Sequence, residues 1–158
     1  MAKFFDTSED ILELAENQFE ECGLATYGLT LKVISTSKGR DIISVAKASA
    51  TTEFVSKQDS MIIVTIYEKA FDMLDEAAKK LFMEAAFSGI TYDSEKDKIN
   101  VDKNPAAMIH RMRHKYNNSV LDTLELNELI IKQIEEEEKA EKEAKKREKE
   151  EKRAAKLK

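Results

Sequence analysis

The C-terminal segment of the chain contains almost no residue that a folded core could use. From Glu135 to Lys158 the apolar residues are four alanines and one leucine, and all the others are Lys, Glu or Arg. Such a segment has strong helix propensity and many ion pairs four residues apart, but it has no apolar stripe to pack. We therefore expect a compact domain over residues 1–131 and a charged tail, helical or disordered, over residues 132–158.

Charge also differs between these two parts. Residues 1–131 contain 15 Lys and Arg and 22 Asp and Glu, a net charge of −7, whereas residues 132–158 contain 11 and 9, a net charge of +2. An acidic domain is a poor surface for phosphates, which favour clustered positive charge. The tail leaves nucleic acid binding open through Lys145, Lys146 and Arg147, but interleaved glutamates favour a solvating role.

The single cysteine, Cys22, excludes an internal disulfide and fits a reducing compartment. It follows two glutamates, which disfavour a reactive thiolate, so we expect it to be a packing residue. Residues 1–6 lack the apolar stretch of a secretory signal. The longest apolar strand candidate, Met61–Ile66, is too short to span a membrane. These features predict a cytoplasmic protein without membrane contact.

Hydrophobic periodicity predicts the regular elements. The continuous apolar run of residues 61–66 predicts a central strand that is buried on both faces. Residues 29–34 alternate between apolar and polar, and together with a second strand from Ile42 they predict a hairpin around the turn at 37–40. Apolar spacing and helix caps predict further elements, which are helices at 8–22, 75–88 and 105–115, a last helix from about residue 119, a short helix at 67–74, a loop or short helix at 48–58, and a hairpin or ordered loop at 90–101.

The order of elements between Tyr67 and Tyr116 resembles that of the zincin-like metallopeptidases encoded by bacteriophages. In that family a sheet is followed by a helix with the motif HExxH, in which two histidines hold zinc and the glutamate is the general base. The corresponding window here is Met83-Glu84-Ala85-Ala86-Phe87, in which only Glu84 matches. The resemblance therefore implies a degenerate member with a vestigial Glu84 and no zinc. The alternative is that Glu84 is an ordinary helix residue pointing to solvent.

The two histidines, His110 and His114, are four residues apart on the predicted helix at 105–115 and are weak candidates for metal ligands. Three cationic neighbours, Arg111, Arg113 and Lys115, would repel a divalent ion. These cations favour a basic surface that binds an anion or nucleic acid. The turn Asp93–Asp97 lacks the glycine and terminal glutamate of a calcium loop, so we expect a polar turn.

The sequence thus predicts an α+β fold with a small mixed β-sheet, packed helices and a long charged C-terminal helix or tail. The function expected first is that of a non-enzymatic phage-type protein, a degenerate zincin-like domain without a cofactor that binds an unknown protein partner or assembles into a virion. The alternatives are a nucleic-acid-associated protein that uses the basic helix and the tail, and a residual metal-dependent hydrolase in which Glu84, His110 and His114 converge. In a phage setting the compartment is the host cytoplasm or the virion, and the oligomeric state stays open.

Overall fold

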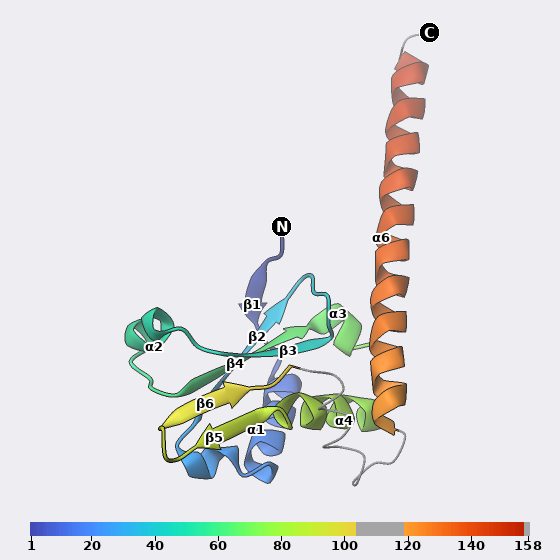
Figure 1. Ribbon diagram of the computed structural model, residues 1–158. Coiled ribbons are helices and arrows are strands. Elements are labelled where there is room, and N and C mark those ends of the chain that lie inside the picture. Colours follow the sequence, from blue (N-terminus) through green and yellow to red (C-terminus); the bar gives the residue numbers. More distant parts are fainter. Residues whose placement is uncertain (104–118, 157–158) are drawn as a thin grey trace.

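A computed structural model describes residues 1–103 and 119–156 as an α+β fold, with a mixed four-stranded sheet, a second small sheet and a long C-terminal helix (Figure 1). This fold class is the predicted one. The predicted helix at 105–115 lies outside the described residues. The elements in chain order are β1 (Phe4–Asp6), α1 (Glu9–Glu21), the 3-10 helix η1 (Leu24–Tyr27), β2 (Thr30–Thr36), β3 (Ile43–Lys47), α2 (Ala50–Ser56), β4 (Met61–Tyr67), α3 (Glu68–Phe71), α4 (Glu76–Phe87), β5 (Ile90–Asp93), β6 (Lys98–Val101) and α6 (Ser119–Lys156).

Strand β4 is the centre of the four-stranded sheet, whose order is β1-β2-β4-β3. It pairs in parallel with β2 and antiparallel with β3, so that Val64 lies between Val33 and Val45. Ile62, Val64 and Ile66 are fully buried. The prediction of a central strand is confirmed. The predicted burial on both faces is not complete, because Ile63 and Thr65, which point to the other face, are only partly buried.

The predicted hairpin of β2 and β3 is wrong, because β4 lies between these two strands. The segment that follows β2 instead crosses the end of β4, where the carbonyl of Ile42 accepts a hydrogen bond from the amide of Tyr67 at 2.9 Å. Placing β4 in the middle pairs both of its edges and buries the face that carries Ile62, Val64 and Ile66. Strand β1, which pairs with β2, was not predicted from its three exposed residues.

Helices α1 and α4 lie together on one side of the sheet (Figure 1). The rings of Phe19 on α1 and Phe87 on α4 meet edge to face, with centroids 5.7 Å apart. Asp75 caps α4, since its side chain accepts a hydrogen bond from the amide of Ala78 at 2.7 Å. Gly23, with a φ of +72°, follows the end of α1 in a left-handed conformation that glycine adopts without strain. Both predicted helices are confirmed.

The segment at 90–101 forms the antiparallel hairpin of β5 and β6, with Ile90 opposite Val101 and Tyr92 opposite Ile99. Ile90 and Ile99 are buried in the core. Residues 50–56 form helix α2, which was one of the two alternatives predicted there. The second small sheet therefore extends the core beside α4.

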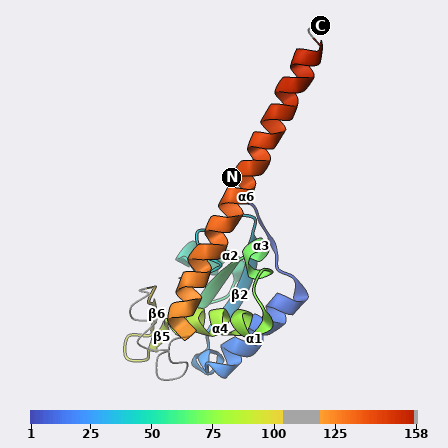
Figure 2. The ribbon, with the colours of Figure 1, turned by 90° about the vertical axis from the view of Figure 1, so that its right-hand side faces the viewer.

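Helix α6 is one helix of 38 residues that begins against the domain and then leaves it (Figures 1 and 2). Between residues 124 and 154, its buried residues are Ile130, Ile131 and Ile134. Every residue from 139 to 154 is exposed, so the predicted charged tail is a continuous helix that projects from the domain. Among the described residues, no helix has both the length and the apolar character that crossing a membrane requires.

Candidate functional site

Helix α4 carries the window that corresponds to the zinc-binding motif. Met83 and Phe87, which stand at the two histidine positions, are 0% and 1% exposed and belong to the hydrophobic core. A thioether and a phenyl ring cannot replace the imidazole nitrogens that hold zinc in this motif. The residues present therefore do not fit a zincin metal centre, and no catalytic step through zinc follows from them.

Glu84 does not point to solvent as its ordinary interpretation predicted. It is 8% exposed and lines a pocket of about 270 Å³ between α1 and α4. The position follows from the register of α4, because residues 82 to 85 and 87 are buried while the helix is packed against α1 and the sheet. Sequence periodicity gave no sign of this burial, since a lone glutamate in a helix is usually solvated.

The pocket beside Glu84 is polar on its α1 side. Gln18, which is 2% exposed, donates a hydrogen bond from Nε2 to Oε2 of Glu21 at 2.8 Å. Its Oε1 atom meets no donor within the described part of the chain. Cys22 also lines the pocket and is partly buried. The oxygen atoms of these side chains can accept hydrogen bonds from a water molecule.

The remaining residues predicted for a site are not brought together by the described structure. The residues His110, His114, Arg111, Arg113 and Lys115 lie outside the described residues. The convergence of the two histidines with Glu84 and the basic surface of the three cations therefore stay predictions. In residues 1–103 and 119–156 no three His, Cys, Asp or Glu side chains are grouped as metal ligands. The turn Asp93–Asp97 is a polar turn as predicted, in which Asp93 Oδ1 accepts bonds from the amides of residues 95 and 96.

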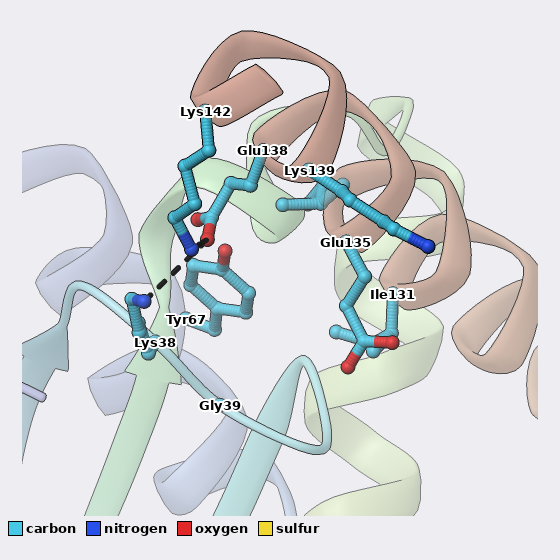
Figure 3. A pocket seen from close by; sticks show the side chains of 9 residues that line it. Lys38, Gly39, Tyr67, Ile131, Glu135, Glu138, Lys139 and Lys142 are labelled. Carbon is cyan, nitrogen blue, oxygen red and sulfur yellow. Dashed lines mark ion pairs between the residues drawn. The ribbon is translucent and has the colours of Figure 1, made fainter. Parts of the chain in front are cut away.

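A groove between the domain and α6 is the second site of interest (Figure 3). It has a volume of about 310 Å³, and the ring of Tyr67 forms its floor at the end of β4. Glu138 lies above the ring and is 3.5 Å from Lys38 and 3.8 Å from Lys142. Burial, followed by the negative charges of Glu138 and Glu135, raises the pKa of the Tyr67 hydroxyl above its usual 10.0.

Two residues near the groove hold the loop between β2 and β3 against its neighbours. Asn127 joins the loop to α6, and Gly39 lets it lie close to Tyr67. Asn127 Oδ1 accepts a hydrogen bond from the amide of Ile42 at 2.9 Å, so it replaces the strand partner that this amide lacks. Gly39 passes close to the floor, and a Cβ atom there would lie 2.9 Å from the carbonyl oxygen of Asp41 and 3.3 Å from Cβ of Tyr67. The loop, the floor and α6 are therefore fitted to one another.

The exposed part of α6 separates its charges around the helix axis. At about 100° per residue, seven of the eight basic residues between 139 and 154 fall within an arc of about 140°, and all five glutamates fall outside it. We call these seven residues the basic face, which consists of Lys139, Lys142, Lys145, Lys146, Lys149, Lys152 and Arg153. The linear sequence interleaves these charges, and only the helical projection separates them.

The basic face continues the face by which α6 is docked. Ile131, Ile134 and Glu138 contact the domain at intervals of three and four residues. The same intervals lead from Glu138 to Lys142, Lys145, Lys149 and Lys152. Because one side of an α-helix repeats at this spacing, these lysines point to the side on which the domain lies, beyond its edge. The basic face was not predicted from the sequence, although the spacing of its lysines can be read there.

Comparison of the chain with protein-family models, with curated proteins and with solved structures finds no match. The described residues include a polar pocket beside Glu84, an apolar core at Met83 and Phe87, and a projecting helix with one basic face.

Proposed function

We propose that this protein is a non-enzymatic, phage-type binding module, a zincin-like domain in which hydrophobic core has taken the place of the metal centre. The observation that carries the proposal is the burial of Met83 and Phe87, at 0% and 1% exposure, on the helix that would bear the zinc-binding histidines. Restoring histidine at either position would place a polar ring in the core. The domain is thus built for stability at the point where an enzyme would hold its metal.

Helix α6 supports the binding part of the proposal. A helix of this composition gains nothing from packing beyond Glu138, because every residue from 139 to 154 is exposed. Its docked portion nevertheless fixes the direction in which the exposed portion projects, through three buried isoleucines and the hydrogen bond of Asn127. A rigidly directed, highly charged helix is suited to presenting a surface to a partner at low cost in ordering entropy.

Elemental analysis and a peptidase assay of the purified full-length protein test the non-enzymatic part. We expect zinc far below one ion per chain and no cleavage of an unstructured protein substrate. Matched variants are His110→Ala/His114→Ala, which removes both histidines, and Cys22→Ser, which removes the thiol. Stoichiometric zinc that disappears in the histidine variant, together with peptidase activity, would contradict the proposal and make Glu84 the next residue to substitute.

A second candidate function, that of a nucleic-acid-associated protein, is favoured by the basic face of α6. The interleaved glutamates that argued against it in the linear sequence fall outside the arc of the basic face when the sequence is projected on the helix. The two candidates are compatible, because the partner of a binding module can be a nucleic acid. The positive charge of the basic face favours such a partner.

A further inference from the structure

The cations of the basic face are unevenly neutralised by their neighbours. Lys142, Lys145 and Lys152 each lie within ion-pair distance of a glutamate four residues earlier. In the part of the chain that the structure describes, no carboxylate lies within such distance of the other four members, which are Lys139, Lys146, Lys149 and Arg153. The face therefore presents positive charge to an outside ligand, whereas the helix as a whole, with 10 Lys and Arg and 12 Asp and Glu, is weakly acidic.

The dimensions of this face match a polyanion of regular shape. The exposed portion of α6 from residue 139 to 154 is about 24 Å long, and a helix with its side chains is about 10–12 Å wide. The major groove of a B-form DNA duplex is about 12 Å wide and admits a helix, with phosphates along both of its margins. Lysines along one side of a helix reach phosphates without reading bases.

We infer that the basic face of α6 binds the phosphate backbone of a nucleic-acid duplex without sequence specificity. This inference names the partner class of the binding module proposed above and rests on that proposal. Glu135 and Glu138, which lie just before the exposed portion of the helix, are close to Tyr67 and weaken the positive electrostatic potential there. The duplex is therefore held beyond Glu138, on the side of the helix that continues its docked face.

Other occupants fit the basic face less well. Single-stranded nucleic acid is bound by stacking on aromatic rings, and residues 139–154 contain no aromatic residue. A membrane surface is bound by a helix with a large apolar face, and the side opposite the basic face holds glutamates, alanines and Arg147. The acidic domain of a second copy carries scattered charge rather than a regular row of phosphates. The high charge density of a duplex and the regular spacing of its phosphates together favour a duplex as the ligand.

The experiment measures binding of the full-length protein to a short duplex DNA by fluorescence anisotropy at salt concentrations from about 50 mM to about 200 mM. Four to seven neutralised phosphates predict a slope of log affinity against log salt of about −4 to −6. A competitor duplex of unrelated sequence should displace the probe equally well, because phosphate contacts carry no sequence information.

Two triple variants that each lower the net charge by three isolate the basic face. Lys146→Gln/Lys149→Gln/Arg153→Gln removes unpaired cations from it, and we expect affinity to fall about 100-fold with a slope reduced by about 3. The control lowers charge on the other side of the helix, where a loss below about 5-fold is expected, and circular dichroism verifies equal helix content in both. The control substitutions are Ala140→Glu, Arg147→Gln and Ala154→Glu.

Several results would overturn the inference. These are equal losses in the two triple variants, preference for single-stranded DNA, binding to anionic vesicles but not to duplex, and salt-dependent self-association without duplex binding. The last result would assign the face to a second copy of the chain. Failure here leaves the non-enzymatic proposal standing, whereas zinc with peptidase activity would overturn that proposal and leave duplex binding to be judged on the anisotropy data.

Discussion

At the scale of single residues, the groove under α6 shows how a few side chains fix the direction of a long helix. Asn127 supplies an acceptor to the amide of Ile42, and Glu138 lies between Lys38 and Lys142 over the ring of Tyr67. The ion pairs are exposed and contribute little, typically below about 1 kcal/mol each. The hydrogen bond to a backbone amide beside the core contributes more, because its loss would leave a donor unsatisfied.

The Tyr67 hydroxyl should report on the docking of α6 through its ionisation. Because burial and then Glu138 and Glu135 raise its pKa above 10.0, its contribution to stability is complete below that pH and is lost as the pH rises through the higher folded-state pKa. In an ultraviolet titration of tyrosinate, Glu138→Gln should lower this pKa. The neighbouring Glu137→Gln should leave it unchanged, since Glu137 pairs with Lys69 instead.

The Tyr67→Phe variant identifies the signal of Tyr67 in that titration, because one ionisation step at high pH should be absent from the variant. A second late step should remain, since the hydrogen bond from Tyr92 to Asp97 also raises the pKa of Tyr92. Equal titrations of the Glu138→Gln variant and the unsubstituted protein would mean that α6 does not lie over Tyr67 in solution.

Single residues also show where prediction from the sequence stops. The apolar character of Met83 and Phe87 is visible in the sequence, but the burial of Glu84 depends on α1, which is distant along the chain. The acceptor role of Asn127 toward Ile42 joins residues 85 positions apart, and no local pattern encodes it. Local spacing determines which face of a helix is apolar, whereas partners across the fold come from the tertiary arrangement.

At the scale of elements, α6 combines an anchored portion and an unanchored portion in one continuous helix. Only the anchored portion has apolar residues in the core, so the stability of the exposed portion comes from helix propensity and from ion pairs four residues apart. The order of the strands was predicted only in part. The apolar run of β4 predicted its central position, but the parallel pairing of β2 with β4 is a long-range choice that the alternating pattern could not reveal.

Ile134→Ala should weaken the anchored portion strongly. Ile134 is 1% exposed, and truncating a buried isoleucine to alanine costs about 2–5 kcal/mol through lost burial and the cavity left behind. The matched control is Leu129→Ala on the same helix, where a side chain that is 62% exposed should cost less than about 1 kcal/mol. Urea unfolding measures both, and similar small costs would show that α6 does not pack on the domain.

At the scale of the whole molecule, the chain is an acidic domain that holds a helix with one basic face. Met83 and Phe87 belong to its hydrophobic core. The pattern of residues along the sequence correctly predicted an α+β fold with a long charged C-terminal helix or tail. The separation of charges on α6 required the sequence to be projected on a helix, because counting charges along the chain averages the two sides.

The proposed binding function depends on the exposed portion of α6 being free for a partner rather than part of the fold. The most direct measurement compares the free energy of unfolding of the full chain with that of two truncated chains. A chain ending at Glu138 should match the full chain within about 1 kcal/mol, because it loses only exposed residues and weak surface ion pairs. A chain ending at Leu126 should lose several kcal/mol, since it also lacks Asn127 and the three buried isoleucines. Equal destabilisation of both truncated chains would contradict the account, because the portion beyond Glu138 would then be needed for folding.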